Sequence, residues 1–190
     1  VGGRKFFGTI LYLFDFYGLI IFSYLIYTRC KNFVADILTT FFSLDRRRRT
    51  VRGVAKRHNL RYLHFNDVNS QESHESISSL QPDVIFSLAC PQILKESTFK
   101  IPKKGSYNIH SSLLPKFRGI NAIFWALRFR EPETGVTIHK VNCTIDGGVI
   151  FLQEKIDISN IYSLDSLYSN VIKIGTSMVC QFLNNVDHYK

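Results

Sequence analysis

The chain is poor in cysteine, and none of its cysteines is spaced to bind a metal. Its 190 residues include four, Cys30, Cys90, Cys143 and Cys180, and no two of them form a Cys-x-x-Cys pair. This spacing indicates neither a zinc site nor a disulfide framework, so we expect no metal. The sequence also has no secretory signature, and a cytoplasmic, reducing environment is the simplest expectation.

Two common catalytic motifs are also absent. Ser111-Ser112 is not framed as Gly-x-Ser-x-Gly, which argues against a serine hydrolase of the α/β type. No Gly-x-x-x-x-Gly-Lys segment is present to cradle the phosphates of a nucleotide. There is no internal repeat and no low-complexity linker. With 45% apolar residues, the composition is typical of a single globular domain over residues 1–190.

The sequence has no Met at its start and opens at Val1 on Gly2-Gly3-Arg4-Lys5. An α/β domain ordinarily opens with a buried strand, and none precedes the first helical stretch. We therefore expect a fragment in which the first strands of such a domain are missing.

Residues 6–27 form a long apolar run whose single charge is Asp15. The length suits a membrane span, but Gly8 and Gly18 interrupt it, and a central carboxylate costs about 3 kcal/mol on insertion. The preferred interpretation is a helical apolar insertion over residues 6–44, packed on the domain. A membrane-surface contact or an oligomer contact is the next alternative, and a true membrane span is the third.

The formal net charge of +9 favours anionic partners such as nucleic acid, phosphorylated metabolites or acidic lipid. Part of this charge is local, because residues 46–49 are all arginine and Arg52, Lys56 and Arg57 follow them. Such a basic helix contacts nucleic acid in one interpretation and is only a solvated face in the other.

Strand and helix signals alternate along the rest of the chain. Short apolar or alternating runs predict strands, and apolar residues three and four apart predict helices. The expected strands are residues 60–65, 84–89, 106–109, 134–142 and 149–158. The expected helices are residues 48–58, 70–80, 121–129 and 164–183, the last of them capped by Ser163. This order predicts the α/β class, with a Rossmann-like, mostly parallel sheet flanked by helices.

The most informative motif is Asn108-Ile109-His110, followed by Ser-Ser-Leu-Leu-Pro. It stands at the end of an expected strand, and Asp146 follows a later strand in an Asp-Gly-Gly turn. Since ligands of open parallel sheets bind beyond the carboxyl ends of the strands, His110 and Asp146 are expected to face one cleft. An amide donor, an imidazole and an orienting carboxylate are what acyl transfer to an amine requires.

The order, spacing and framing of these residues resemble the folate-dependent formyltransferases, most clearly over residues 84–158, the expected catalytic core. The resemblance implies the formyltransferase fold and transfer of a formyl group from 10-formyltetrahydrofolate to a primary amine. It assigns Asn108 to the oxyanion and His110 to general acid/base work and oxyanion contact. Asp146 then orients His110 and orders a proton-relay water.

The resemblance also implies the walls of a donor pocket and a set of supporting residues. The two walls are the loop after the first buried strand and the loop before Asp146; their matching residues are Gln92, Ile93, Leu94, Val141, Asn142 and Ile145. Among the supporting residues, Ser112 ties its loop through its hydroxyl, and Pro115 fixes a sharp bend for which a cis bond is one form. Gly119 permits close backbone approach, and His139 matches a histidine common in the family.

The motif does not name the acceptor. The long apolar segment resembles a branch of the family whose acceptors are often amino sugars, so an amino sugar or an anionic sugar nucleotide is the first expectation. Methionyl-tRNA, favoured by the basic helix, and glycinamide ribonucleotide are the alternatives within this class. The family often has Asp-Thr-Gly where Asp146-Gly147-Gly148 stands here. A hypothesis from another class is a non-catalytic, membrane-associated or interaction module on the same scaffold.

Overall fold

The computed structural model describes residues 50–161 and 163–188. The chain divides into two units, Val1–His64 and Phe65–Lys190, and each is described by itself. The apolar insertion expected over residues 6–44 lies outside the described residues. In the part of the chain that is described, no helix has the length and apolar character needed to cross a membrane.

The first unit contains helix α2, Val51–Arg57, where the sequence predicts a basic helix over residues 48–58. The Oγ1 of Thr50 caps it by accepting from the N–H of Gly53 at 3.1 Å. Spacing of three and four residues favours Val51, Val54 and Ala55 as its inner face, and the structure differs at the two valines. Gly53 and Ala55 are buried, whereas Val51 is 78% exposed and Val54 is 42% exposed.

The second unit is built on a four-stranded sheet in the order β1-β2-β3-β4. The strands are β1 Val84–Leu88, β2 Gly105–His110, β3 Glu133–Lys140 and β4 Ile150–Asp157. β1 and β2 pair in parallel, and β3 pairs antiparallel with both β2 and β4. Three of the four strands therefore point the same way, which confirms the predicted fold class, and β3 runs against them.

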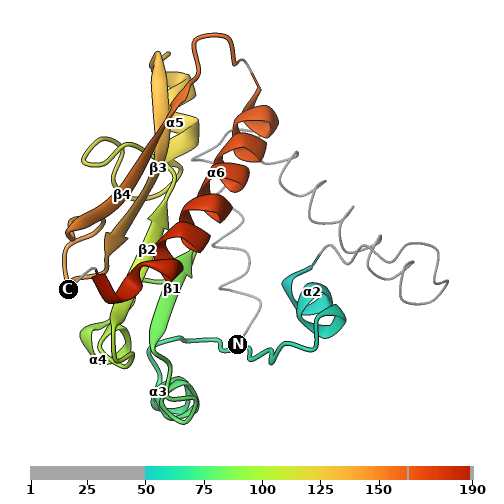
Figure 1. Ribbon diagram of the computed structural model, residues 1–190, viewed down its shortest axis with the longest axis vertical. Helices are drawn as coiled ribbons and strands as arrows, with labels where there is room; N and C mark the ends of the chain where they lie inside the picture. Colours follow the sequence, from blue (N-terminus) through green and yellow to red (C-terminus); the bar gives the residue numbers. More distant parts are fainter. Residues whose placement is uncertain (1–49, 162, 189–190) are drawn as a thin grey trace, which may run out of the picture. The chain divides into compact units, whose positions relative to one another are not determined.

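Helices α5, Ala122–Arg128, and α6, Leu164–Asn184, both contact β3 and each other. They cover one face of the sheet, as Figure 1 shows for the long helix α6. The hydroxyl of Ser163 caps α6, as predicted, by accepting from the N–H of Ser166 at 3.3 Å. Residues three and four apart form its buried stripe: Leu167, Val171, Gly175, Met178 and Phe182.

An aromatic cluster forms the centre of the core under α6. The ring of Tyr107 on β2 lies 4.5 Å from the ring of Phe182 on α6, centroid to centroid. Phe86 and Phe151 complete the cluster from β1 and β4, each with its ring edge-on to Phe182. Because side chains alternate along a strand, the neighbours of Tyr107 on β2 point to the opposite face of the sheet.

Two short helices precede β2: α3, Gln71–Ser78, capped by Ser70, and α4, Glu96–Phe99. The sequence predicts α3 but not α4, which has only four residues. The strand predicted over residues 60–65 is wrong, since no strand lies there. The side chains here do not alternate between buried and exposed: Leu60, Tyr62 and Leu63 are 62%, 40% and 36% exposed.

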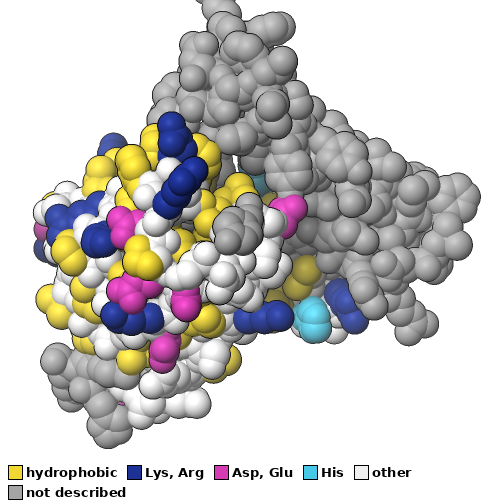
Figure 2. Space-filling model, turned by 90° about the horizontal axis from the view of Figure 1, so that it is seen from above, with side chains coloured by type: hydrophobic (Ala, Val, Ile, Leu, Met, Phe, Trp, Pro, Cys, Tyr) yellow, Lys and Arg dark blue, Asp and Glu magenta, His cyan; other side chains and the backbone are white. Residues whose placement is uncertain are grey.

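Seen from the end of the sheet where α5 lies, the surface carries Lys and Arg side chains beside hydrophobic ones (Figure 2). This distribution agrees with the basic balance of the sequence. Cys90, Cys143 and Cys180 are free and exposed.

Candidate functional site

Strands β2 and β3 place four polar side chains on the face of the sheet that α5 and α6 leave uncovered. In the antiparallel register, Asn108 lies opposite His139 and His110 lies opposite Thr137. All four alternate with core residues such as Ile109 and so share one face. His110 is 7% exposed, Thr137 is fully buried and His139 is 2% exposed. The strand period and the β2–β3 register thus gather Asn108, His110 and His139.

Asp146 reaches the same place from the loop that joins β3 to β4. Its backbone has a φ of 46°, and the loop is closed by a bond from the N–H of Lys140 to the carbonyl of Val149 at 2.8 Å. The expected meeting of His110 and Asp146 occurs, but by another route than predicted. Because β3 is antiparallel, its carboxyl end pairs near the start of β2, with Lys140 opposite Tyr107. The fold of the loop, and not strand direction, brings Asp146 to His110.

The carboxylate of Asp146 is the hub of the site. Its Oδ2 accepts from the backbone N–H of Gly119 at 2.7 Å and lies 3.5 Å from Nδ1 of His110. Its Oδ1 accepts from Nδ2 of Asn108 at 3.1 Å and lies 3.3 Å from Nε2 of His139. Burial alone would raise the pKa of Asp146, but the hydrogen bonds from His139 and Gly119, with the nearby His110, lower it to about 2. Asp146 is therefore a carboxylate at neutral pH.

The imidazole of His110 is fixed at both nitrogens. Its Nε2 lies 2.8 Å from the backbone carbonyl of Phe117, an acceptor, so Nε2 carries a proton and donates there. Its Nδ1 faces Asp146. Both neighbours are oxygen acceptors, and together they hold the ring in one orientation.

The amide of Asn108 has two acceptors within reach. Nδ2 lies 3.1 Å from Oδ1 of Asp146 and 3.2 Å from Nε2 of His139. The carboxylate accepts only, so the NH₂ group of Asn108 must point toward it. The hydrogen bond from His139 that lowers the pKa of Asp146 needs a proton on Nε2. In that form Nε2 donates to the carboxylate and leaves one amide hydrogen of Asn108 free for another acceptor.

The loop after β2 is held by buried hydroxyls. Ser112 is fully buried and its Oγ donates to the carbonyl of Lys116 at 2.6 Å, the loop-tying contact expected for it. Thr137 donates to the carbonyl of Ser112 at 2.6 Å. The Leu114–Pro115 peptide is cis. These bonds fix the segment that ends at Gly119, whose φ is 86°.

Two residues of this network are missing from the sequence-based set. Gln153 on β4 donates to the carbonyl of Leu114 at 3.0 Å and to Oγ1 of Thr137 at 2.9 Å. Thr137 carries a sequence signal, since it stands two residues before His139 on the same strand face. Gln153 carries none, because its role depends on the register that places it opposite Thr137.

The residues expected to line a donor pocket lie in two loops, 89–95 and 141–147. Ile93 and Ile145 present apolar side chains that are 70% and 56% exposed. The amide of Gln92 is already engaged: Oε1 accepts from the N–H of Val68, and Nε2 donates to the carbonyl of Asn66, both at 2.8 Å. Gln92 therefore holds its loop, and the part that Gln92, Ile93 and Ile145 play in donor binding stays a prediction.

The other expected pocket residues have backbone or loop contacts. Leu94 is half-buried. The N–H of Val141 donates to the carbonyl of Ser106 at 2.8 Å, and Oδ1 of Asn142 accepts from the N–H of Thr144 at 2.9 Å. These contacts hold the loop in front of Asp146 and leave the role of Leu94, Val141 and Asn142 in donor binding as a prediction.

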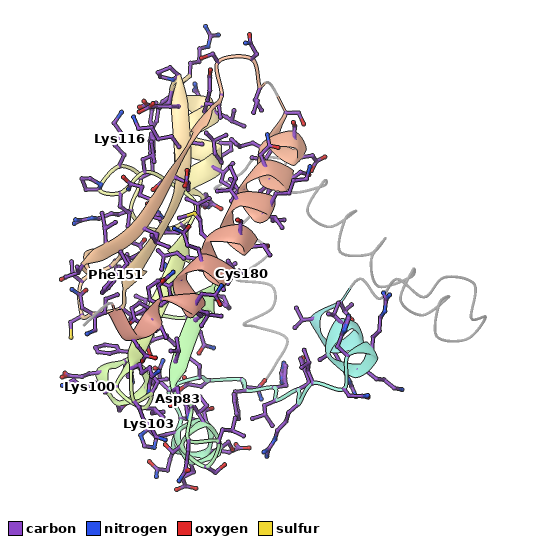
Figure 3. The ribbon with its side chains drawn as sticks, in the orientation of Figure 1. Asp83, Lys100, Lys103, Lys116, Phe151 and Cys180 are labelled. Carbon is purple, nitrogen blue, oxygen red and sulfur yellow. The ribbon has the colours of Figure 1, made fainter. Side chains whose placement is uncertain are left out.

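A separate cavity of about 440 Å³ lies between α3 and α4 and is lined by His74, Lys100 and Lys103 among others. It contains none of the candidate residues. Figure 3 places Lys100 and Lys103 at the opposite end of the sheet from Lys116, which belongs to the loop after β2. Within residues 50–161 and 163–188, no group of three His, Cys, Asp or Glu side chains is arranged to hold a metal ion.

The amino-acid sequence is similar to those of known proteins. Residues 40–183 match the formyl transferase family. The chain is 37% identical over 136 residues to the methionyl-tRNA formyltransferase of Kosmotoga olearia, an alignment that covers 72% of this chain and 44% of that protein. The chain thus spans less than half the length of that relative.

Solved structures give the same picture of the fold. Phosphoribosylglycinamide formyltransferase from Bacillus halodurans superposes with a TM-score of 0.57 at 28% identity, covering 65% of this chain and 69% of that one. HypX from Aquifex aeolicus, crystallised with tetrahydrofolic acid, superposes with a TM-score of 0.55 at 22% identity, covering 60% of this chain and 20% of that one. The second likeness bears on the fold alone.

Proposed function

The chain belongs to the formyl transferase family, and on that premise we propose that it transfers a formyl group from 10-formyltetrahydrofolate to a primary amine. The observation that carries the proposal is the Asp146 carboxylate, which joins Asn108, His110 and the backbone of Gly119 in one partly buried cluster. This cluster supplies a titratable imidazole, an amide donor and an ionised carboxylate at one place.

The chemistry uses each of these groups. A neutral amine attacks the formyl carbon, and the carbonyl oxygen becomes an oxyanion in a tetrahedral intermediate. In its proposed role His110 exchanges its bond to the carbonyl of Phe117 for one to that oxyanion, and the amide hydrogen of Asn108 that is not bonded to Asp146 is the second donor. Collapse of the intermediate breaks the bond to the donor nitrogen, which must gain the proton that the amine loses. Asp146 holds His110 in place and orders the water through which that proton passes from the amine to the donor nitrogen.

The two exposed isoleucines support the donor side. Ile93 and Ile145 give apolar surface on the two loops that flank the site, where a flat ring needs it. Binding of 5-formyltetrahydrofolate, a stable analogue, is expected to raise the melting temperature of the full-length protein. Ile93→Trp is expected to abolish this shift, because added bulk fills the pocket.

The test of the reaction is substitution at the cluster in the full-length protein. We expect His110→Ala and Asp146→Asn each to lower the rate of formyl transfer by roughly a hundredfold or more, with the fold retained by circular dichroism. Activity of either variant within a few-fold of the parent protein excludes the assigned roles. A folded parent protein that neither binds the folate analogue nor transfers formyl supports the non-catalytic module instead.

Three acceptor classes belong to the proposal. The sequence favours an amino sugar or sugar nucleotide, the name of the Kosmotoga olearia relative favours methionyl-tRNA, and the name of the Bacillus halodurans structure favours glycinamide ribonucleotide. Formylation assays with the three acceptors separate them, and binding of tRNA falls steeply with salt. The cytoplasmic location, and the membrane-surface contact of residues 6–27, belong to the same proposal; cell fractionation of the full-length protein tests both.

A further inference from the structure

The loop between β1 and α4, residues 89–95, begins in a backbone conformation that its first residue disfavours. Ala89 has a φ of 48°, in the left-handed region, where a residue with a Cβ is uncommon. Such a conformation persists only where surrounding contacts hold the chain in it, and residues of this kind gather at functional sites and ligand clamps. The loop must therefore be held by contacts elsewhere along its length.

The side chain of Asn69 holds the far end of this loop. Its Nδ2 donates to the carbonyl of Ile93 at 2.9 Å, and its Oδ1 accepts from the N–H of Lys95 at 2.7 Å and from Oγ1 of Thr98 at 3.0 Å. A carbonyl only accepts and a backbone N–H only donates, so the amide of Asn69 has one possible orientation. One side chain thus satisfies three polar groups of the loop and of α4.

A second amide spans the same two segments in the opposite direction. Gln92, in the loop, holds the backbone of Val68 and Asn66 through its two 2.8 Å bonds. We call the two side chains that cross in this way, Asn69 and Gln92, the amide pair. Both residues belong to the second unit of the chain. Together they tie residues 92–98 to residues 66–69.

The segment on which the amide pair is anchored is itself fixed. Oδ1 of Asp67 accepts from the N–H of Asn69 at 2.8 Å and so closes a turn. The carbonyl of Asp67 accepts from Oγ of Ser73, a fully buried residue of α3, at 2.6 Å. The amide pair therefore joins the start of α3 to the start of α4, and Figure 1 shows these two helices at the same end of the sheet.

We propose that the amide pair positions the loop 89–95 to receive the folate donor, and that neither amide touches the ligand. The inference rests on the proposed function for the identity of that ligand. The pair fixes the backbone at Ile93 and beside it, and leaves the side chain of Ile93 70% exposed. An apolar surface that is held in place before binding loses little conformational entropy when a ligand covers it.

The effect is expected on the donor alone. The hydrogen bonds that the structure shows for the two amides all end within residues 66–98, and none of them reaches the cluster around Asp146. Loss of the pair should therefore raise the KM of the donor and leave kcat and the KM of the acceptor in place.

The binding test measures the Kd of 5-formyltetrahydrofolate for the full-length protein by isothermal titration calorimetry. Asn69→Leu removes all three side-chain bonds at similar volume and is expected to raise Kd about tenfold or more. Gln92→Met keeps the length of the side chain without its bonds and is expected to raise Kd several-fold. In formyl transfer to the acceptor that the parent protein uses, the KM of the donor should rise with Kd.

Two further variants separate positioning from general loss of stability. Glycine adopts a φ of 48° without strain, so a loop with Ala89→Gly depends less on the amide pair. The double variant Asn69→Leu/Ala89→Gly is therefore expected to bind the analogue several-fold more tightly than Asn69→Leu. The matched control is Gln71→Met, which removes an exposed amide bonded to Glu75 and should leave Kd within about twofold. Circular dichroism and melting temperature check that each variant is folded.

Three outcomes overturn the inference while the parent protein still binds the analogue and transfers formyl, so that the proposed function stands. In the first, folded Asn69→Leu and Gln92→Met bind the analogue within about twofold of the parent protein. In the second, Asn69→Leu lowers kcat or raises the KM of the acceptor as much as that of the donor. In the third, Ala89→Gly restores no binding to Asn69→Leu. A folded parent protein that does not bind the analogue removes the proposed function, and the donor role of the amide pair with it.

Discussion

The backbone N–H of Gly119 donates to Oδ2 of Asp146 at 2.7 Å, and this bond ties the loop after β2 to the loop after β3. Gly119 can do this because its φ is 86°, a region that residues with a Cβ rarely adopt. A Cβ at this position would meet no atom within 4 Å. The requirement for glycine is therefore conformational and not one of space.

Gly119→Ala is expected to destabilise the protein by about 1–2 kcal/mol, the cost of a left-handed backbone for an L-residue. Formyl transfer should fall as well, because relaxation of the backbone moves the N–H away from Asp146. Urea unfolding and a rate assay measure the two effects.

Gly175→Ala is the matched control and is expected to change the stability of the protein in the opposite direction. Gly175 lies within α6, and an added Cβ would meet Ile109 and Val136 at ordinary contact distances of 3.7 and 3.8 Å. Alanine there is expected to stabilise the protein by roughly 0.5–1 kcal/mol. Equal destabilisation by both substitutions would contradict the conformational account of Gly119.

Asp146→Asn is expected to make the stability of the protein less dependent on pH. The pKa of Asp146 is about 2 in the folded protein, against a reference value of 3.8 for an unperturbed aspartate. The carboxylate therefore contributes about 2 kcal/mol to the free energy of unfolding above pH 4. This contribution is lost as the pH falls through 2. Urea unfolding at pH 7 and pH 2.5 should show a difference between variant and parent protein that shrinks at the lower pH. A difference in stability that stays the same at both pH values would exclude ionisation of Asp146 as the cause of that difference. The control is Asp83→Asn, which removes an exposed carboxylate.

His139→Leu is expected to raise the pKa of Asp146, because the hydrogen bond from His139 is one of the interactions that lower it. The acid limb of kcat/KM should then move to higher pH. We expect kcat to fall about tenfold or more, since a hydrogen bond to a charged group contributes roughly 1.5–3 kcal/mol. His74→Leu, a histidine outside the site, should leave the profile in place. An unmoved acid limb in His139→Leu would reduce His139 to a packing residue.

Phe182→Ala is expected to destabilise the protein by about 3–5 kcal/mol, as for other buried aromatic residues. Phe182 is fully buried and contacts rings from β1, β2 and β4. Leu183→Ala, on the next residue of α6, should cost less than about 1 kcal/mol because Leu183 is 46% exposed. Similar losses from both would show that the cluster is not the centre of the core.

The sequence predicts those parts of the fold whose signals are local. The helix over residues 164–183 combines a serine cap with apolar residues three and four apart, and it is found as α6, Leu164–Asn184. The strand that delivers His110 is likewise found within one residue at each end. Both patterns depend on neighbours along the chain, so no tertiary information is needed.

Other parts depend on contacts that the sequence does not encode locally. Alternation along residues 134–142 predicts a strand but carries no direction, and the antiparallel course of β3 escaped the sequence reasoning. The same holds for Gln153, whose contact with Thr137 arises from the β3–β4 register. In α2, Gly53 is buried where the sequence favours Val54. The buried face of so short a helix depends on what packs against it.

The geometry of the turn after Asp146 predicts which of its positions can vary in sequence among relatives. A Cβ at Gly148 would stand 1.7 Å from the carbonyl oxygen of Lys140, a backbone atom that cannot rotate away. A Cβ at Gly147 would clash with the side chain of Thr144, with Cγ2 at 2.6 Å, and would meet the Thr144 carbonyl oxygen only at an ordinary 3.6 Å. Position 148 is therefore closed to every other residue, while position 147 is open to a larger one whenever position 144 shrinks or turns. In relatives that carry Asp-Thr-Gly, the residues at positions 144 and 147 are expected to vary together. Such paired substitutions would be a consequence of the loop geometry that holds Asp146.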